Sequence, residues 1–204
     1  MLDRLRKKVL QYVTNSCYNR IKNRRIRMIN MGEEKGIFNA VDLAAYIAKK
    51  YHEEYSNGRF EISPIKLQKS LYFCFAMWGG LIRKAKKNPE FVEENLTEQK
   101  EILFDDEIEA WVYGPVIPNV YNAHKENKLG DSIIVEKEFE KNSFLKETIN
   151  SILDDLFEVA DFKLVSISHE DKCWSNNFDS DDMYHNYIID KDLIISEYAN
   201  KQHI

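Results

Sequence analysis

The chain has 204 residues, of which 44% are hydrophobic, and its formal net charge is −5. A chain of this size and apolar content buries a core without disulfides or a structural metal, as one domain with an extension or as two small domains. The low counts of glycine (7) and proline (4) argue against a sandwich of many tight turns. Three widely spaced cysteines favour a reducing cytoplasm over a secreted fate, and no long apolar run predicts a membrane span.

The first residues differ from the rest in charge. Residues 1–29 hold nine basic side chains and one acid, a charge of +8, so the remainder carries −13. Leu2, Leu5 and Val9 recur at helical spacing, which predicts a basic helical extension. We therefore predict an extension with a linker at residues 1–36, followed by a domain at residues 37–204.

Two helices are expected to open the domain. Asn39 is placed to cap the first helix, over residues 40–54. Ser63 caps the second, which begins at Pro64 and keeps an apolar stripe through Trp78. A pair of glycines directly after Trp78 predicts the end of this helix.

A small hairpin is expected in the middle of the chain. The charged residues 83–101 predict an exposed loop or a frayed helix. Residues 102–104 and 107–113 resemble two strands joined by a two-aspartate turn. Gly114-Pro115 should end the second strand.

The remaining elements are mainly helical. Pro118 begins a helix, residues 131–139 predict a strand, and Ser143 caps a longer helix. Apolar spacing predicts two further helices, over residues 161–168 and 190–199. The chain as a whole is thus expected to be α+β, mostly α-helical, with a small β-hairpin and a basic N-terminal extension.

The sequence offers few candidates for catalysis. His169 and Cys173 could form a nucleophile pair, but nothing fixes the geometry that this chemistry needs. Together with His185 they match no known metal-ligand spacing. Four acids of the expected hairpin could hold Mg²⁺, but consecutive acids point apart, which favours a solvated turn: Asp105, Asp106, Glu107 and Glu109. We expect no catalytic residue, no cofactor and no metal.

The basic extension is the one feature that suggests nucleic acid. Arg20, Arg24 and Arg27 share a helical face, with Arg25 beside them, and could meet phosphates. A solvated helix explains them equally, as does an arm that docks onto the acidic body or onto an acidic partner.

Two motifs carry a family resemblance. Residues 64–72 read P-x-K-L-Q-K-x-L-Y, and residues 109–121 read E-A-W-x-x-G-P-V-x-P-x-V-Y. Together they resemble the Panacea domain, also called SocA-like or GepA-like, over about residues 37–200. His169 and Trp174 match a further family segment, in which Cys173 stands where proline is usual.

The resemblance implies a bacterial or prophage protein that neutralises an unrelated protein toxin by binding it. One relative implies an alternative role as an adaptor that hands its toxin to a protease, and phage counter-defence is a further setting. Aromatic residues beside a rigid glycine-proline connector suit such an interface. The residues expected to bind the partner are Lys66, Gln68, Lys69, Trp111, Tyr113, Gly114, Pro115, Pro118, Tyr121, His169 and Trp174.

Structural roles remain open for the same residues. Trp111 and Tyr121 could simply cover the helix at residues 64–78. The polar residues of the first motif could form that helix's outer face. His169 and Trp174 could be a hydrogen-bonding and packing pair in the core.

Overall fold

The computed structural model describes residues 35–91, 94–182 and 187–201. The basic extension with Arg20, Arg24, Arg25 and Arg27 lies outside the described residues, as does His185. The predicted boundary between extension and domain therefore stays a prediction.

The two predicted opening helices are present with their predicted caps. Helix α2 (Ala40–Lys50) continues into one π-helical turn, η1 (Tyr51–Tyr55), and the Asn39 side chain accepts a hydrogen bond at its start. Helix α3 (Pro64–Lys87) is capped by Ser63, whose hydroxyl accepts from the backbone N–H of Lys66, the third residue of the helix. Both side chains satisfy donors that a helix start leaves unpaired.

The prediction that α3 ends at its glycine pair is wrong, because the helix continues to Lys87. Gly79 and Gly80 instead admit a second helix, α10 (Lys191–Asn200), to close range. A Cβ on Gly79 would lie 2.6 Å from Cγ1 of Ile195, and one on Gly80 would lie 2.7 Å from Cβ of Tyr198. Glycine here serves close helix packing rather than termination.

The hairpin exists but is displaced along the chain. Strands β1 (Glu109–Trp111) and β2 (Gly114–Val116) are antiparallel neighbours, and β3 (Tyr187–Ile188) pairs with the other side of β1. The predicted strand at residues 102–104 forms only one isolated parallel bridge, between Phe104 and Phe38. The glycine-proline pair that was expected to end the hairpin is part of β2.

The two aspartates of the expected turn also serve a different purpose. Asp105 accepts a hydrogen bond from the Gly36 backbone at 2.8 Å, and Asp106 accepts from the Ala40 backbone at 3.2 Å. Asp106 also accepts from the Asn119 side chain at 2.9 Å. Asp105 is exposed and Asp106 is half-buried, so both remain in contact with solvent as predicted, and they also tie the start of α2 to the middle of the chain.

The predicted strand at residues 131–139 is wrong, because this segment is a helix. Val135 and Phe139 are one helical turn apart and both buried, and Phe139 makes edge contacts with the rings of Phe38 and Tyr46. The remaining elements are η2 (Pro89–Phe91), α4 (Glu94–Thr97), α5 (Pro118–Lys125), α6 (Ile133–Lys141), α7 (Ser143–Phe157), α8 (Asp161–His169) and α9 (Lys172–Ser175).

Four further predicted helices are confirmed, namely α5, α7 and α8 and the C-terminal helix α10. The cap of α7 is Asn142 rather than Ser143, since the Asn142 side chain accepts from the Leu145 backbone. The described elements are mostly helices, with one small three-stranded sheet, so the predicted α+β, mostly α-helical class is confirmed.

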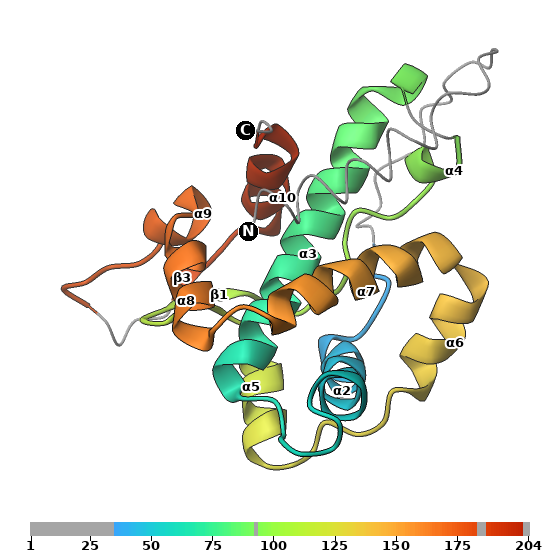
Figure 1. Ribbon diagram of the computed structural model, residues 1–204. Helices are drawn as coiled ribbons and strands as arrows, with labels where there is room; N and C mark the ends of the chain where they lie inside the picture. The colour runs from blue at the N-terminus through green and yellow to red at the C-terminus, as the bar shows by residue number, and fades with distance from the viewer. Residues whose placement is uncertain (1–34, 92–93, 183–186, 202–204) are drawn as a thin grey trace.

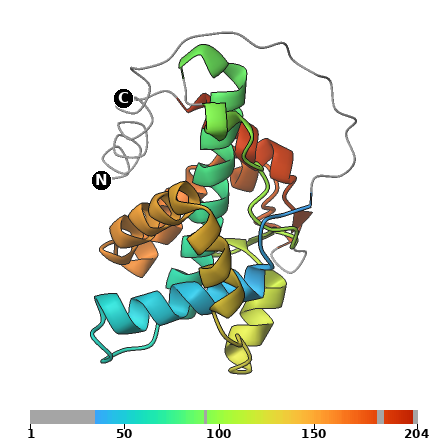
Figure 2. The same cartoon turned by 90° about the vertical axis from the view of Figure 1, so that its right-hand side faces the viewer.

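Helix α3 is the centre of the molecule. Most of its residues between Lys66 and Ile82 are buried, including Trp78, Tyr72 and Phe73. Helix α7 crosses α3, α10 lies along it, and α2 lies across its N-terminal end (Figures 1 and 2). Within the described ranges, no helix is both long enough and apolar enough to cross a membrane.

Candidate functional site

The three segments that carry the family resemblance meet in space. The first turns of α3 bond to the backbone that follows β1, and α9, which follows α8, bonds to the same hairpin (Figure 1). Residues far apart in the chain thus build one site around the β1–β2 turn.

The polar residues of the first motif point into the protein. The Gln68 amide accepts from the Ile117 backbone N–H at 2.8 Å and donates to the Ile117 carbonyl at 3.4 Å. Lys66 donates to the carbonyl groups of Leu156 and Phe157, and it forms an ion pair with Asp161 at 3.3 Å. Both side chains are buried, so the interpretation as a polar outer face is wrong.

Lys69 is the most deeply buried of these residues, at 1% exposure. Its ammonium donates to the Pro115 carbonyl at 2.7 Å. Burial lowers the pKa of Lys69 from its usual 10.5 to about 7, because the charged form is costly away from water. Gly114 has a φ of +90°, and any Cβ there would collide with the Ser168 hydroxyl and lie 3.0 Å from Nζ of Lys69.

His169 and Trp174 support the hairpin from the other side. Their rings stack in parallel with centroids 3.8 Å apart, and the indole N–H of Trp174 donates to the Trp111 carbonyl at 3.0 Å. Burial, followed by the nearby charge of Lys69, lowers the pKa of His169. His169 and Trp174 therefore form the expected packing pair, and Trp174 binds the pair to the backbone of β1 through its hydrogen bond.

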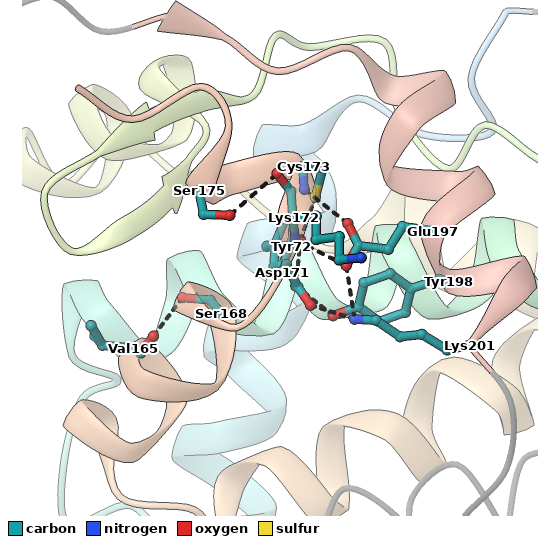
Figure 3. A network of polar contacts seen from close by, with 10 residues as sticks. All are labelled: Tyr72, Val165, Ser168, Asp171, Lys172, Cys173, Ser175, Glu197, Tyr198 and Lys201. Atoms are coloured by element: carbon teal, nitrogen blue, oxygen red, sulfur yellow. Dashed lines mark hydrogen bonds and ion pairs between the residues drawn. The ribbon is translucent and has the colours of Figure 1, made fainter.

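A buried carboxylate next to this stack joins three helices (Figure 3). Asp171 accepts hydrogen bonds from the hydroxyls of Tyr72 at 2.6 Å and Tyr198 at 2.7 Å, and it forms an ion pair with Lys201. Because these partners come from α3 and from the end of α10, Asp171 ties the C-terminal helix to the core.

The geometry does not provide an activated nucleophile at Cys173. The Cys173 sulfur lies 3.3 Å from the Tyr72 hydroxyl, whereas His169 stacks on Trp174. Burial raises the pKa of the Cys173 thiol from 9.0 to about 12, and a reactive thiol needs the opposite shift. Among the described residues, no group of three histidine, cysteine, aspartate or glutamate side chains is arranged to hold a metal ion.

The outer side of the same site is apolar and exposed. The β1–β2 turn presents Val112 and Tyr113, and the Tyr113 ring contacts that of Phe162 on α8 with centroids 6.3 Å apart. Trp111 of β1 packs edge-on against Tyr121 of α5. The exposed fractions are 43% for Val112, 55% for Tyr113, 67% for Phe162 and 55% for Ile188 of β3. We call Val112, Tyr113 and Phe162 the turn patch.

The structure divides the predicted binding residues into two groups. The side chains of Trp111, Tyr113, Pro118 and Tyr121 reach the surface at least in part. The inward group consists of the buried Lys66, Gln68, Lys69, Gly114, Pro115 and Trp174 with the half-buried His169. Lys66 is bound to the end of α7, and the other members lie in or against the hairpin.

Sequence reasoning missed several residues of the site. Phe162 had a usable signal, since it is an apolar residue on the polar side of a short helix. Asp171 had none, because its partners lie 99 and 27 residues away along the chain.

Comparison with known families confirms the resemblance for the second motif and the segment with His169 and Trp174, whereas the first motif, at residues 64–72, lies outside the match. The family model described as "Antitoxin SocA-like, Panacea domain" matches residues 92–175, which include the β1–β2 hairpin, α8 and α9. Residues 92–175 of this chain are thus similar to the SocA-like Panacea antitoxin domain. Searches of curated proteins and of solved structures gave no match.

Proposed function

We propose that this protein is an antitoxin that neutralises a cognate protein toxin by binding it directly, with the turn patch as the centre of the interface. The observation that carries this proposal is the exposure of Val112, Tyr113 and Phe162 at one place, where the rings of Tyr113 and Phe162 are in contact. A cluster of exposed apolar side chains on a folded domain is typical of a protein interaction site.

The backbone under the patch is well suited to binding. The hairpin is fastened by Lys69 to Pro115, by Gln68 to Ile117 and by Trp174 to Trp111. A turn held in this way loses little conformational freedom when a partner docks, which favours affinity. Tyrosine and tryptophan are also frequent anchors at the centre of protein interfaces.

Neutralisation would then be stoichiometric. The toxin's working surface would be covered by an interface of roughly 1,600 Å², the usual size for a stable complex. The inward residues Lys66, Gln68 and Lys69 would act as positioning residues, since their side chains are occupied inside the fold.

Growth rescue tests this proposal. A toxin gene recovered by capture on the full-length chain is expressed with either the wild-type chain or a V112S/Y113S variant. We expect the wild type to restore growth and the variant to fail, because two apolar anchors have become small and polar. An I134S variant is the matched control, since Ile134 is equally exposed but lies on α6, away from the hairpin (Figure 1).

Two alternatives give different results in the same cells. For a protease adaptor, toxin levels would fall on co-expression, whereas sequestration leaves the level of toxin unchanged. For a nucleic-acid binder that uses Arg20, Arg24, Arg25 and Arg27, binding to DNA or RNA would weaken steeply with salt. Phage counter-defence would use the same protein-binding chemistry against a different target.

A further inference from the structure

A groove of about 740 Å³ lies between α6 and α7. We call it the α6–α7 groove. Helix α6 contributes two of its lining residues, and one face of α7 contributes most of the others: Phe139, Glu140, Ser143, Glu147, Ser151 and Asp154. No residue of the turn patch lines this groove.

The inner side of the groove is apolar and fixed. Phe139 is 2% exposed, and its ring packs edge-on against the rings of Phe38 and Tyr46. The Tyr46 hydroxyl donates to the side chain of Asn150, another lining residue, at 2.8 Å. Phe38 is three residues after Lys35, the first described residue, so the N-terminal end of the described chain is in contact with the groove's wall.

The walls of the groove are mainly acidic. Glu140, Glu147 and Asp154 line it together with one base, Lys146. Asp154 forms an ion pair with Lys50 at 3.0 Å, and 63% of its side chain remains exposed. Since a carboxylate has about four acceptor positions, this pair leaves capacity for further donors. The groove therefore suits a basic segment that also carries apolar side chains.

A second contact places the start of the described chain beside the groove. The Lys35 carbonyl accepts from the Lys100 ammonium at 3.2 Å. The neighbouring Gln99 accepts from the side chain of Asn142 at 2.8 Å, and Asn142 caps α7 directly before Ser143 of the groove. Residues 1–34 are therefore attached to the domain near the first turn of α7.

The sequence before Lys35 supplies the complementary charge. Residues 20–27 hold five basic side chains, no acid and two isoleucines, and we call them the basic segment. Only residues 28–34 separate this segment from Lys35, and a stretch of that length reaches up to roughly 25 Å. The face of α7 from Ser143 to Asp154 is shorter, at roughly 17 Å. The basic segment can therefore reach the whole groove.

We propose that the basic segment of this chain docks into the α6–α7 groove. Its arginines pair with the acidic walls, and its isoleucines cover apolar lining surface. Each exposed ion pair contributes little, but a short linker gives the attached segment an effective concentration in the millimolar range. A docked segment has its arginines occupied, so docking competes with binding to phosphates. This inference does not rest on the proposed function.

A spin label on Cys17 tests the docking in the full-length chain. Cys74 and Cys173 are buried, and burial raises the pKa of both thiols, so a thiol-directed label reacts with Cys17 instead. Cys17 is three residues before the basic segment. A C17S chain, which should take up no label, verifies the position of the label.

The label reports its neighbours by broadening their amide signals in the NMR spectrum of the isotope-labelled chain. We expect strong broadening at Ser143 and Ser151 in the groove. The control amide is that of Ile188 on β3, which Figure 1 shows on the other side of the molecule from α6, and its signal should stay sharp.

Substitutions make the test specific. R20S/R24S/R27S should lower the ratio of docked to undocked chain roughly tenfold, because three exposed ion pairs are lost, and broadening in the groove should fall accordingly. E140Q/E147Q should act in the same direction from the side of the groove. R4S/R6S/K7S removes three charges outside the basic segment and should leave the broadening unchanged.

Broadening that is spread evenly, is centred elsewhere or persists in R20S/R24S/R27S would each overturn the docking. Broadening that appears only when spin-labelled and isotope-labelled copies are mixed would assign the groove to a second copy, which also overturns it. None of these results depends on a toxin, so the docking and the proposed function can fail separately.

Discussion

At the scale of single residues, the main feature is a buried lysine that has no carboxylate partner among the described residues. Lys69 is held by the Pro115 carbonyl beneath the β1–β2 turn, and burial is the cause of its lowered pKa. Lysine is rarely fully buried, which explains why its spacing in the motif led to the prediction of an outer face. The periodicity of α3 could not reveal the error, because this helix is covered on nearly every side.

The buried amine makes stability depend on pH in a defined direction. Between about pH 7 and pH 10.5 the unfolded chain binds a proton at Lys69 that the folded chain does not, so folding becomes more favourable as pH rises. We expect K69M to remove this contribution and to raise the free energy of unfolding at pH 7 by about 1–2 kcal/mol, despite the lost hydrogen bond to Pro115.

Urea unfolding of wild type and K69M at pH 7 and pH 9 measures the effect. K163M is the control, since Lys163 is exposed on α8. The same pH dependence in K69M as in the wild type would show that Lys69 does not cause it.

Asp171 allows a second prediction at this scale. D171N keeps the shape of the side chain but loses its charge opposite Lys201 and weakens its acceptor role toward Tyr72 and Tyr198. Breaking a buried charge pair by removing one partner is costly, so we expect a loss of about 3 kcal/mol. Thermal unfolding with a Tm unchanged from the wild type would contradict this assignment.

At the scale of elements, the structure shows where sequence patterns were sufficient. Capping residues and proline predicted the starts of α2, α3 and α5, because these signals act within one turn of the chain. The segment that forms α6 was mistaken for a strand, since its β-branched residues Ile133, Ile134 and Val135 favour extended structure. The conformation of α6 is decided by the burial of Phe139 against Phe38 and against Tyr46 of α2. Phe38 lies 101 residues away from Phe139 along the chain, so a local pattern does not reveal this contact.

For the glycine pair of α3 we predict that substitution by alanine lowers stability, which is the opposite of its usual effect in a helix. Replacing glycine by alanine inside an exposed helix normally stabilises by roughly 1 kcal/mol. For G80A we expect destabilisation by about 1–3 kcal/mol, because the new Cβ would meet both the side chain and the backbone of Tyr198. Equilibrium unfolding checks this, and an increase in stability would mean that α10 does not pack at this distance.

At the scale of the whole molecule, the sequence predicted the fold class and the resemblance to the Panacea domain but only part of the site. The three motif segments lie together in space, around the hairpin, the start of α3 and the α8–α9 region. The motifs could not distinguish residues that support the hairpin from residues that face outward, because both groups share the same motifs. Tyr113 lies on the outside and Lys69 on the inside, although both were expected to contact the partner.

The proposed interface predicts an uneven distribution of binding energy. Tyr113 and Phe162 form one contact at the centre of the turn patch, whereas Ile134 lies on α6. Removing a central aromatic anchor typically costs about 2 kcal/mol of binding free energy or more. The same change at Ile134 should cost little.

The most direct test of direct neutralisation is calorimetric titration of the purified toxin with the full-length chain, its V112S/Y113S variant and the I134S control. We predict saturable binding of wild type and I134S at a fixed stoichiometry, with an affinity roughly 30-fold lower for V112S/Y113S. Equal affinities for all three chains would move the interface away from the turn patch. Absence of any heat of binding with the wild type, from a toxin that this chain still suppresses in cells, would contradict neutralisation by direct contact.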